Sequence, residues 1–165
     1  MFVIHRKHRR RPLGVVPAPS RSSDPAGKYA ILYASEAVRC SFWEALARNR
    51  FTRRKRRELP RSDVVARLVV SLLSTETVDL VDLRGDGPIR IAAPTAVAHD
   101  SNHAAGRALS AATYANVPEA DGFLFQLFDR AITKLEALEV TPLIEHADFL
   151  AALDDYDITL SEPPG

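Results

Sequence analysis

The stretch YAILYASEAVRCSFWEALAR, residues 29–48, places an apolar run directly before a helical pattern and so indicates the fold class. Tyr29 to Ala34 predicts a buried strand. Ser35 is a favourable N-cap, and the helix it introduces is expected to continue to about Arg48. Its packing face is predicted from helical spacing to be Val38, Phe42, Ala45 and Leu46. One acid, Glu44, lies in this helix among small and aromatic residues.

Outward from this unit, short strands and short helices alternate without a regular repeat. Strands are predicted at 2–5, 64–74, 77–83, 122–129 and 157–160, with 64–74 and 77–83 forming a hairpin. Helices are predicted at 103–116, 130–138 and 146–156. The pattern indicates an α+β fold with a compact mixed sheet. We expect one domain over residues 1–160 and a loose tail over 161–165.

Composition is typical of an ordinary globular protein, with 46% hydrophobic and 7% aromatic residues in a chain of 165. No stretch approaches the roughly 20 consecutive apolar residues of a membrane span, so we expect a cytoplasmic protein. Cys40 is the single cysteine and is interpreted as a small packing residue. The five histidines show no metal-binding spacing, and no metal is assigned.

The net charge of +1 conceals a division between the two halves of the sequence. Residues 1–61 carry a formal charge of +12 and residues 62–165 carry −11. The runs HRKHRRR and RNRFTRRKRRELPR could contact a phosphate backbone, which makes a nucleic-acid-binding protein one hypothesis. No recognised nucleic-acid module accompanies them, and a solvated or partner-facing basic surface is favoured over nucleic acid.

Three residues are candidates for a ligand site, each with a plainer interpretation. Glu44 shares a helical face with small residues that leave room for a ligand, but spacing alone favours an exposed acid that pairs with Arg48 at i+4. Arg21, in a loop before the strand, is suited to a diphosphate or to solvent. Tyr33, at the strand end, could stack on a flat ring and donate its hydroxyl, or cap the core with its phenol at the surface.

The order of several motifs resembles that of the RES-domain family. They are SRSSDPAGKYAILYAS, Glu44 on the next helix, LVDLRGDG, NHAAGRALSAATYANVPEADGFLF and LFDRAI. The resemblance implies a toxin of a bacterial toxin–antitoxin pair with an ADP-ribosyltransferase-like fold. Such proteins consume NAD by phosphorolysis or hydrolysis, or transfer its ADP-ribose to a protein. The implied partner is an Xre-like antitoxin with a helix-turn-helix.

The resemblance also implies roles for the three candidates. Glu44 matches the family's glutamate and would stabilise positive charge on the ribose carbon or hold a ribose hydroxyl. Arg21 matches the family's loop arginine and would neutralise a phosphate. Tyr33 matches the tyrosine expected beside the nicotinamide. The implied catalytic residues are therefore Glu44 and Arg21, and the NAD-binding residues are Tyr33 and Arg21.

The chain departs from the family pattern after GFLF. The family places a Ser-Arg loop and a second strand there, whereas here GFLF runs directly into QLFDR and Gln126 stands where the loop should begin. A single fused strand is therefore expected. Either activity is weakened or lost, leaving a binding module that still engages the antitoxin, or a serine from elsewhere supplies the hydroxyl. The serines considered for that role are Ser20, Ser101 and Ser110.

Overall fold

Three β-sheets and the helices between them form two units, each assembled from segments that are distant in sequence. The computed structural model describes residues 1–7, 13, 22–24, 26–47, 50–51, 56–94, 97, 103–124 and 126–162. The first unit comprises Met1–Pro12, Ala34–Leu73 and Ala137–Gly165, and the second comprises Leu13–Tyr33 and Ser74–Glu136. Across these described residues, no helix is both long and apolar enough to cross a membrane.

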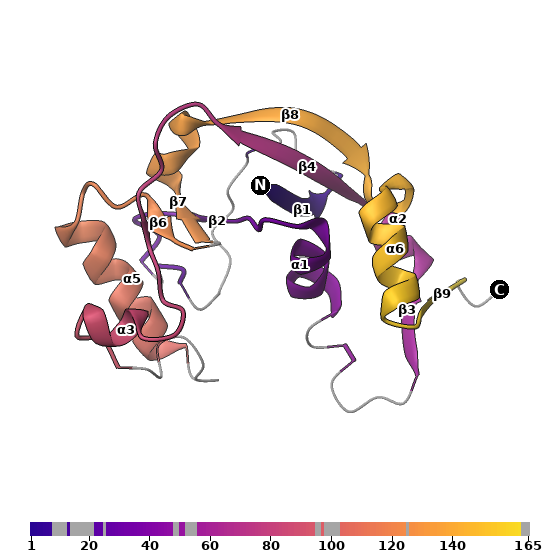
Figure 1. Cartoon of the computed structure of the whole chain (residues 1–165), viewed down its shortest axis with the longest axis horizontal. Helices are drawn as coiled ribbons and strands as arrows, with labels where there is room; N and C mark the ends of the chain where they lie inside the picture. The colour runs from indigo at the N-terminus through magenta and orange to yellow at the C-terminus, as the bar shows by residue number, and fades with distance from the viewer. Residues whose placement is uncertain are drawn as a thin grey trace. The chain divides into compact units, whose positions relative to one another are not determined.

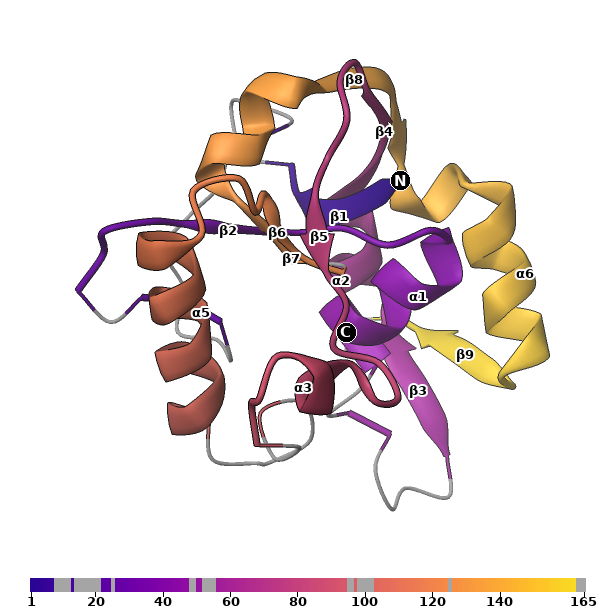
Figure 2. The same ribbon diagram turned by 60° about the vertical axis from the view of Figure 1, so that its left-hand side comes forward.

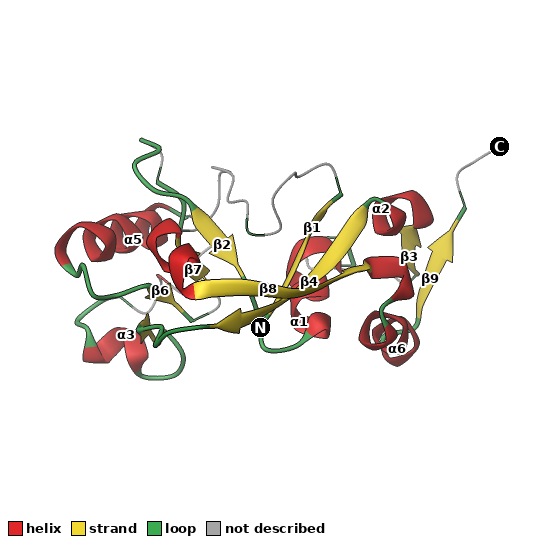
Figure 3. Ribbon diagram, turned by 90° about the horizontal axis from the view of Figure 1, so that it is seen from above, coloured by secondary structure: helices red, strands yellow, loops and turns green. Residues whose placement is uncertain are grey.

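The first unit contains a three-stranded sheet, a parallel strand pair and several short helices. Its strands are β1 (Phe2–Arg6), β3 (Arg57–Pro60), β4 (Arg67–Ser74), β8 (Leu135–Pro142) and β9 (Ile158–Ser161). Its helices are α1 (Val38–Phe42), the π-helix η1 (Trp43–Ala47), α2 (Arg61–Val65), the 3-10 turn η3 (Leu143–Glu145) and α6 (Ala147–Asp155). The sheet order is β1-β4-β8, and β3 pairs in parallel with β9 (Figure 3).

The core of the first unit lies where α1 and α6 pack against each other (Figure 2). The rings of Phe42 and Phe149 meet edge to face with centroids 5.1 Å apart, and both side chains are fully buried. Burying each such side chain contributes about 1.5–3 kcal/mol to folding. Helix α1 is therefore held by apolar contacts on one side, which leaves its other side to solvent.

The second unit contains a four-stranded sheet with α5 beside it (Figure 1). Its strands are β2 (Ile31–Tyr33), β5 (Leu80–Val81), β6 (Gly122–Phe123) and β7 (Gln126–Phe128), in the order β2-β7-β6-β5. Its helices are α3 (Gly87–Arg90), α5 (Ala104–Asn116) and the 3-10 helix η2 (Asp129–Lys134). Tyr114 of α5 stacks on Tyr29 at 4.4 Å between ring centroids, and Phe128 closes this aromatic cluster.

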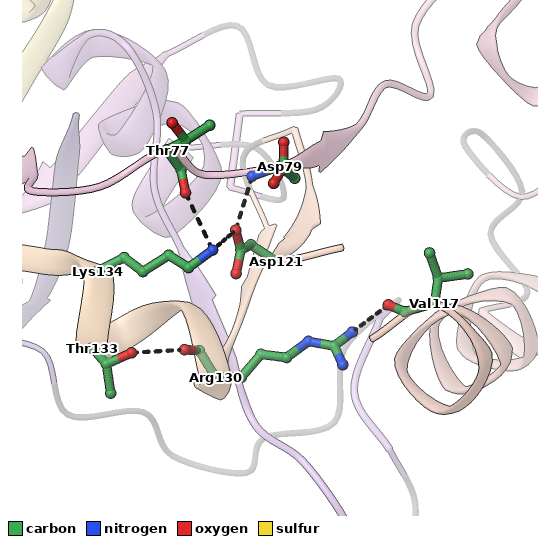
Figure 4. A network of polar contacts seen from close by, with 7 residues as sticks. All are labelled: Thr77, Asp79, Val117, Asp121, Arg130, Thr133 and Lys134. Carbon is green, nitrogen blue, oxygen red and sulfur yellow. Dashed lines mark hydrogen bonds and ion pairs between the residues drawn. The ribbon is translucent and has the colours of Figure 1, made fainter. Parts of the chain in front are cut away.

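A buried carboxylate fixes the loop before β5 to the loop before β6 (Figure 4). Asp121, only 3% exposed, accepts a hydrogen bond from the backbone N–H of Asp79 at 2.8 Å and another from Lys134 Nζ at 2.7 Å. The bond to Asp121 raises the pKa of Lys134 above its usual 10.5. In the same figure Arg130 Nη2 donates to the Val117 carbonyl at 3.1 Å, beyond the end of α5.

Several predictions from the sequence are confirmed. The fold is a mixture of helix and sheet, as the α+β assignment requires. The first strand, the helices predicted at 103–116 and 146–156 and the last strand are all present within a few residues of their expected bounds. The predicted tail overlaps β9 at Ser161, and residues 163–165 lie outside the described part of the chain.

The predicted N-cap at Ser35 is wrong. The helix begins at Val38, and Ser35 instead pairs with Phe2, whose backbone N–H donates to the Ser35 carbonyl at 2.7 Å. The Ser35 hydroxyl donates to the Ala37 carbonyl at 2.7 Å and lies 2.6 Å from Ser41 Oγ. Strand pairing with a residue far earlier in the chain has therefore overridden the local capping preference.

The predicted packing face is correct for Val38, Phe42 and Leu46 and wrong for Ala45, which is exposed. The cause is η1, because a π-helix has more residues per turn than an α-helix and shifts the buried face along the sequence. Ala47 takes the buried place instead.

Cys40 is exposed and is not the packing residue expected.

The predicted hairpin of 64–74 with 77–83 is wrong. Strand β4 pairs with β1 and β8, whereas β5 belongs to the other sheet and pairs in parallel with β6. The predicted helix at 130–138 ends at Lys134, and the chain continues as β8. Both segments pair with strands that are distant in sequence. Local propensity carries no information about such partners, which is why both predictions fail.

The single strand expected over 122–129 is also wrong. The segment folds into an antiparallel hairpin, with Gly122 opposite Leu127 and Phe123 opposite Gln126. Gly122 has φ +154°, and an added Cβ there would lie 2.3 Å from the Gln126 carbonyl oxygen. A glycine is required for this close approach of the two strands. The second strand is thus present, joined to the first by a short turn between Phe123 and Gln126.

Candidate functional site

Glu44 lies in η1, the π-helix that follows α1 in the first unit. The helical segment is held through buried Phe42, Leu46 and Ala47, and Glu44 projects from the exposed side. An exposed carboxylate is accessible to a ligand and to solvent alike, so its position is compatible with both the ligand and the surface-acid interpretations. A π-turn is a frequent feature of functional sites because it redirects side chains relative to a regular helix.

Tyr33 ends β2 in the second unit, with 41% of its surface exposed. The preceding residues, Ile31 and Leu32, are buried on the two faces of the sheet. This partial exposure is compatible with a ring that stacks on a ligand and with a ring that caps the core with its phenol at the surface. Its position directly opposite Gln126 in the β2–β7 ladder places both side chains on one face of the sheet.

Arg21, the predicted phosphate ligand, lies outside the described residues, but the residue after it is well defined. Ser22 is 4% exposed. Its hydroxyl donates a hydrogen bond to Gln126 Oε1, and its carbonyl accepts one from Ser110 Oγ at 2.9 Å. Ser22 is thereby linked to both β7 and α5.

Ser110, one of the three serines considered as a replacement hydroxyl, is fully buried in α5. Because its hydroxyl donates to the Ser22 carbonyl, it stabilises the loop before β2 and is not presented to solvent. Ser20 and Ser101 lie outside the described residues. Parts of both arginine-rich runs do too, namely residues 8–11, 48–49 and 52–55, so the nucleic-acid hypothesis stays a prediction.

The structure thus brings Ser22, Tyr33 and Gln126 together in the second unit, while Glu44 belongs to the first. The sequence alone gives Gln126 no role and marks it only as the position where the family's Ser-Arg loop would begin. Its contact with Ser22 spans 104 positions, so no local pattern contains it. Among the residues with defined positions, no group of three or more His, Cys, Asp or Glu side chains could hold a metal ion.

Comparison with known proteins finds a family that matches most of the chain and a similar protein from a bacterium. Residues 4–128 match the family described as "RES domain". A protein of Sinorhizobium fredii (strain NBRC 101917 / NGR234) named "Probable toxin y4kH" is 33% identical over 92 residues, covering 49% of this chain and 72% of the relative. No solved structure matches the chain.

Proposed function

The chain belongs to the RES domain family, and from this premise we propose that it is a toxin-like enzyme that consumes NAD. The fold proposed for it is that of the ADP-ribosyltransferases. The observation that carries the proposal is the exposed carboxylate of Glu44, which the order of motifs makes the counterpart of the family's glutamate. The similarity to a protein named as a probable toxin supports the same class.

The proposed reaction breaks the bond between the nicotinamide nitrogen and the ribose carbon. The electron pair of that bond leaves with nicotinamide, which departs as a neutral molecule, and positive charge develops on the ribose. An ionised Glu44 would stabilise this charge in the transition state. Because nicotinamide needs no added proton to depart, little general-acid help is needed. Water, phosphate or a protein side chain then bonds to the ribose carbon and loses its proton.

Tyr33 and Arg21 would hold the dinucleotide in position. The exposed ring of Tyr33 offers a stacking surface for the nicotinamide, and Arg21 would neutralise the diphosphate. NAD is the substrate here, and no metal is required by this chemistry. We further propose an Xre-like antitoxin with a helix-turn-helix as the partner and the cytoplasm as the place of action.

A non-catalytic binding module is the alternative, and the β6–β7 hairpin favours it. Its short turn leaves no loop that could carry the family's serine. Such a module would keep the fold and bind the antitoxin without turnover. A pull-down with the product of the neighbouring gene, combined with the NAD assay below, separates the two functions.

The decisive experiment measures nicotinamide release from NAD by the purified chain, with and without phosphate. We expect release by the wild type and a loss of at least about 100-fold in Glu44→Gln, because the transition-state charge loses its partner. Glu36→Gln is the matched control, since Glu36 is also exposed and lies just before α1. Absence of release from the wild type, or equal rates in both variants and the wild type, would exclude the proposed chemistry.

A further inference from the structure

The residue that the proposed reaction leaves without a role is Gln126, the cross-strand neighbour of Tyr33. They face each other across the antiparallel β2–β7 ladder, where opposed Cβ atoms are about 4.5–5.5 Å apart. Tyr33 is exposed and Gln126 is half-buried. A flat ring stacked on Tyr33 would therefore have the Gln126 amide within reach of its substituents.

The orientation of that amide is set by its neighbour. The hydroxyl of Ser22 donates to Gln126 Oε1, and the Ser22 backbone is in turn held by the fully buried Ser110 of α5. The oxygen of the amide is thus already used by the protein. Its Nε2 group, with two N–H donors, has no acceptor among the residues that the structure describes.

We propose that Gln126 is a substrate-binding residue whose Nε2–H donates to the carboxamide oxygen of a nicotinamide ring stacked on Tyr33. The inference rests on the proposed function. It gives this chain a contact with the nicotinamide carboxamide from Gln126, where the family's serine loop is absent. Ser22 acts as a positioning residue, because its hydroxyl fixes which end of the amide faces the ligand.

Binding of two probes tests the contact: NAD, which carries the carboxamide, and ADP-ribose, which has the same diphosphate without the nicotinamide. Both are titrated into the full chain carrying Glu44→Gln, so that turnover does not consume NAD. Adding Gln126→Leu should weaken NAD binding about 3- to 10-fold, as expected for one lost hydrogen bond, and leave ADP-ribose binding unchanged. Ser22→Ala should weaken NAD binding by a smaller factor.

A second measurement changes the ligand and keeps the protein intact. The thionicotinamide analogue of NAD replaces the carboxamide oxygen with sulfur, a weak acceptor. With Gln126 present, NAD should bind more tightly than the analogue, and with Gln126→Leu the two should bind alike. Equal affinities in both proteins, or equal weakening of NAD and ADP-ribose by Gln126→Leu, would overturn the contact. If neither NAD nor ADP-ribose binds any variant, the proposed function itself fails.

Discussion

Tyr29 carries a titratable hydroxyl into the aromatic cluster of the second unit. Burial raises its pKa above the usual 10.0, because the phenolate is poorly solvated there. The stability that this shift contributes is fully present below about pH 10 and is lost as the pH rises through the folded-state pKa. We expect the free energy of unfolding to fall as the pH rises above about 10, and to fall less in Tyr29→Phe.

Urea denaturation at about pH 8, 10 and 11 checks this expectation, with each protein compared with itself at the lowest pH. Parallel loss of stability in the wild type and in Tyr29→Phe would show that Tyr29 does not couple folding to alkaline pH. The substitution keeps the ring and removes only the hydroxyl, so the stacking of residue 29 against Tyr114 is largely retained in the variant.

Individual residues of the candidate site are predictable from the sequence to different extents. Glu44 and Tyr33 are identified as candidates by their positions in the sequence, and both are exposed. Gln126 receives no role, because a continuous strand over 122–129 gives it no reason to contact Ser22. Only the hairpin and the register of β7 against β2 place its amide beside Tyr33.

The hairpin of β6 and β7 depends on Gly122, and replacing it tests that element. Gly122→Ala should lower the free energy of unfolding by about 2 to 4 kcal/mol, since the new Cβ would overlap the Gln126 carbonyl oxygen. Gly85→Ala is the matched control: Gly85 also has positive φ, +56°, but nothing lies within 4 Å of its added Cβ. Gly85→Ala should lower the free energy of unfolding by only about 1 kcal/mol.

Chemical denaturation of both variants measures the difference. A loss at Gly122 no larger than at Gly85 would mean that the two strands adjust to the extra methyl group. In that outcome the close approach at Gly122 would not be what fixes the register of β7.

At the level of elements, α5 is predictable from its alanine-rich composition, although the residues it buries are Gly106, Ser110 and Thr113. Periodicity predicts α6, whose buried Phe149, Ala152 and Leu153 recur at helical spacing. It fails for β4 and β5, whose partners lie in different sheets, and for the segment after η2. It also does not predict η1, because the change from an α-helix to a π-helix moves the buried face from Ala45 to Ala47 without any signal in spacing.

The C-terminal segment lies beyond the part of the chain that matches the family, yet it completes the unit that holds Glu44. Phe149, Ala152 and Leu153 of α6 and Ile158 of β9 belong to the same core as Phe42. A chain ending at residue 146 should therefore fail to fold this unit, since loss of one buried Phe alone costs about 3–5 kcal/mol.

Circular dichroism and soluble yield measure that outcome, and a chain ending at residue 162 serves as the control because it keeps both α6 and β9. Native-like spectra and thermal unfolding of the shorter chain would show that the family-matched part folds without its C-terminal segment.

The parallel pairing of β3 with β9 joins residues 57–60 to residues 158–161. During synthesis on a ribosome, β3 emerges about a hundred residues before its partner, so this strand pair can form only after residues 158–161 have also emerged. A nascent chain would accordingly carry Glu44 on an incomplete unit. The chemistry proposed for Glu44 would therefore have to wait until residues 158–161 are made.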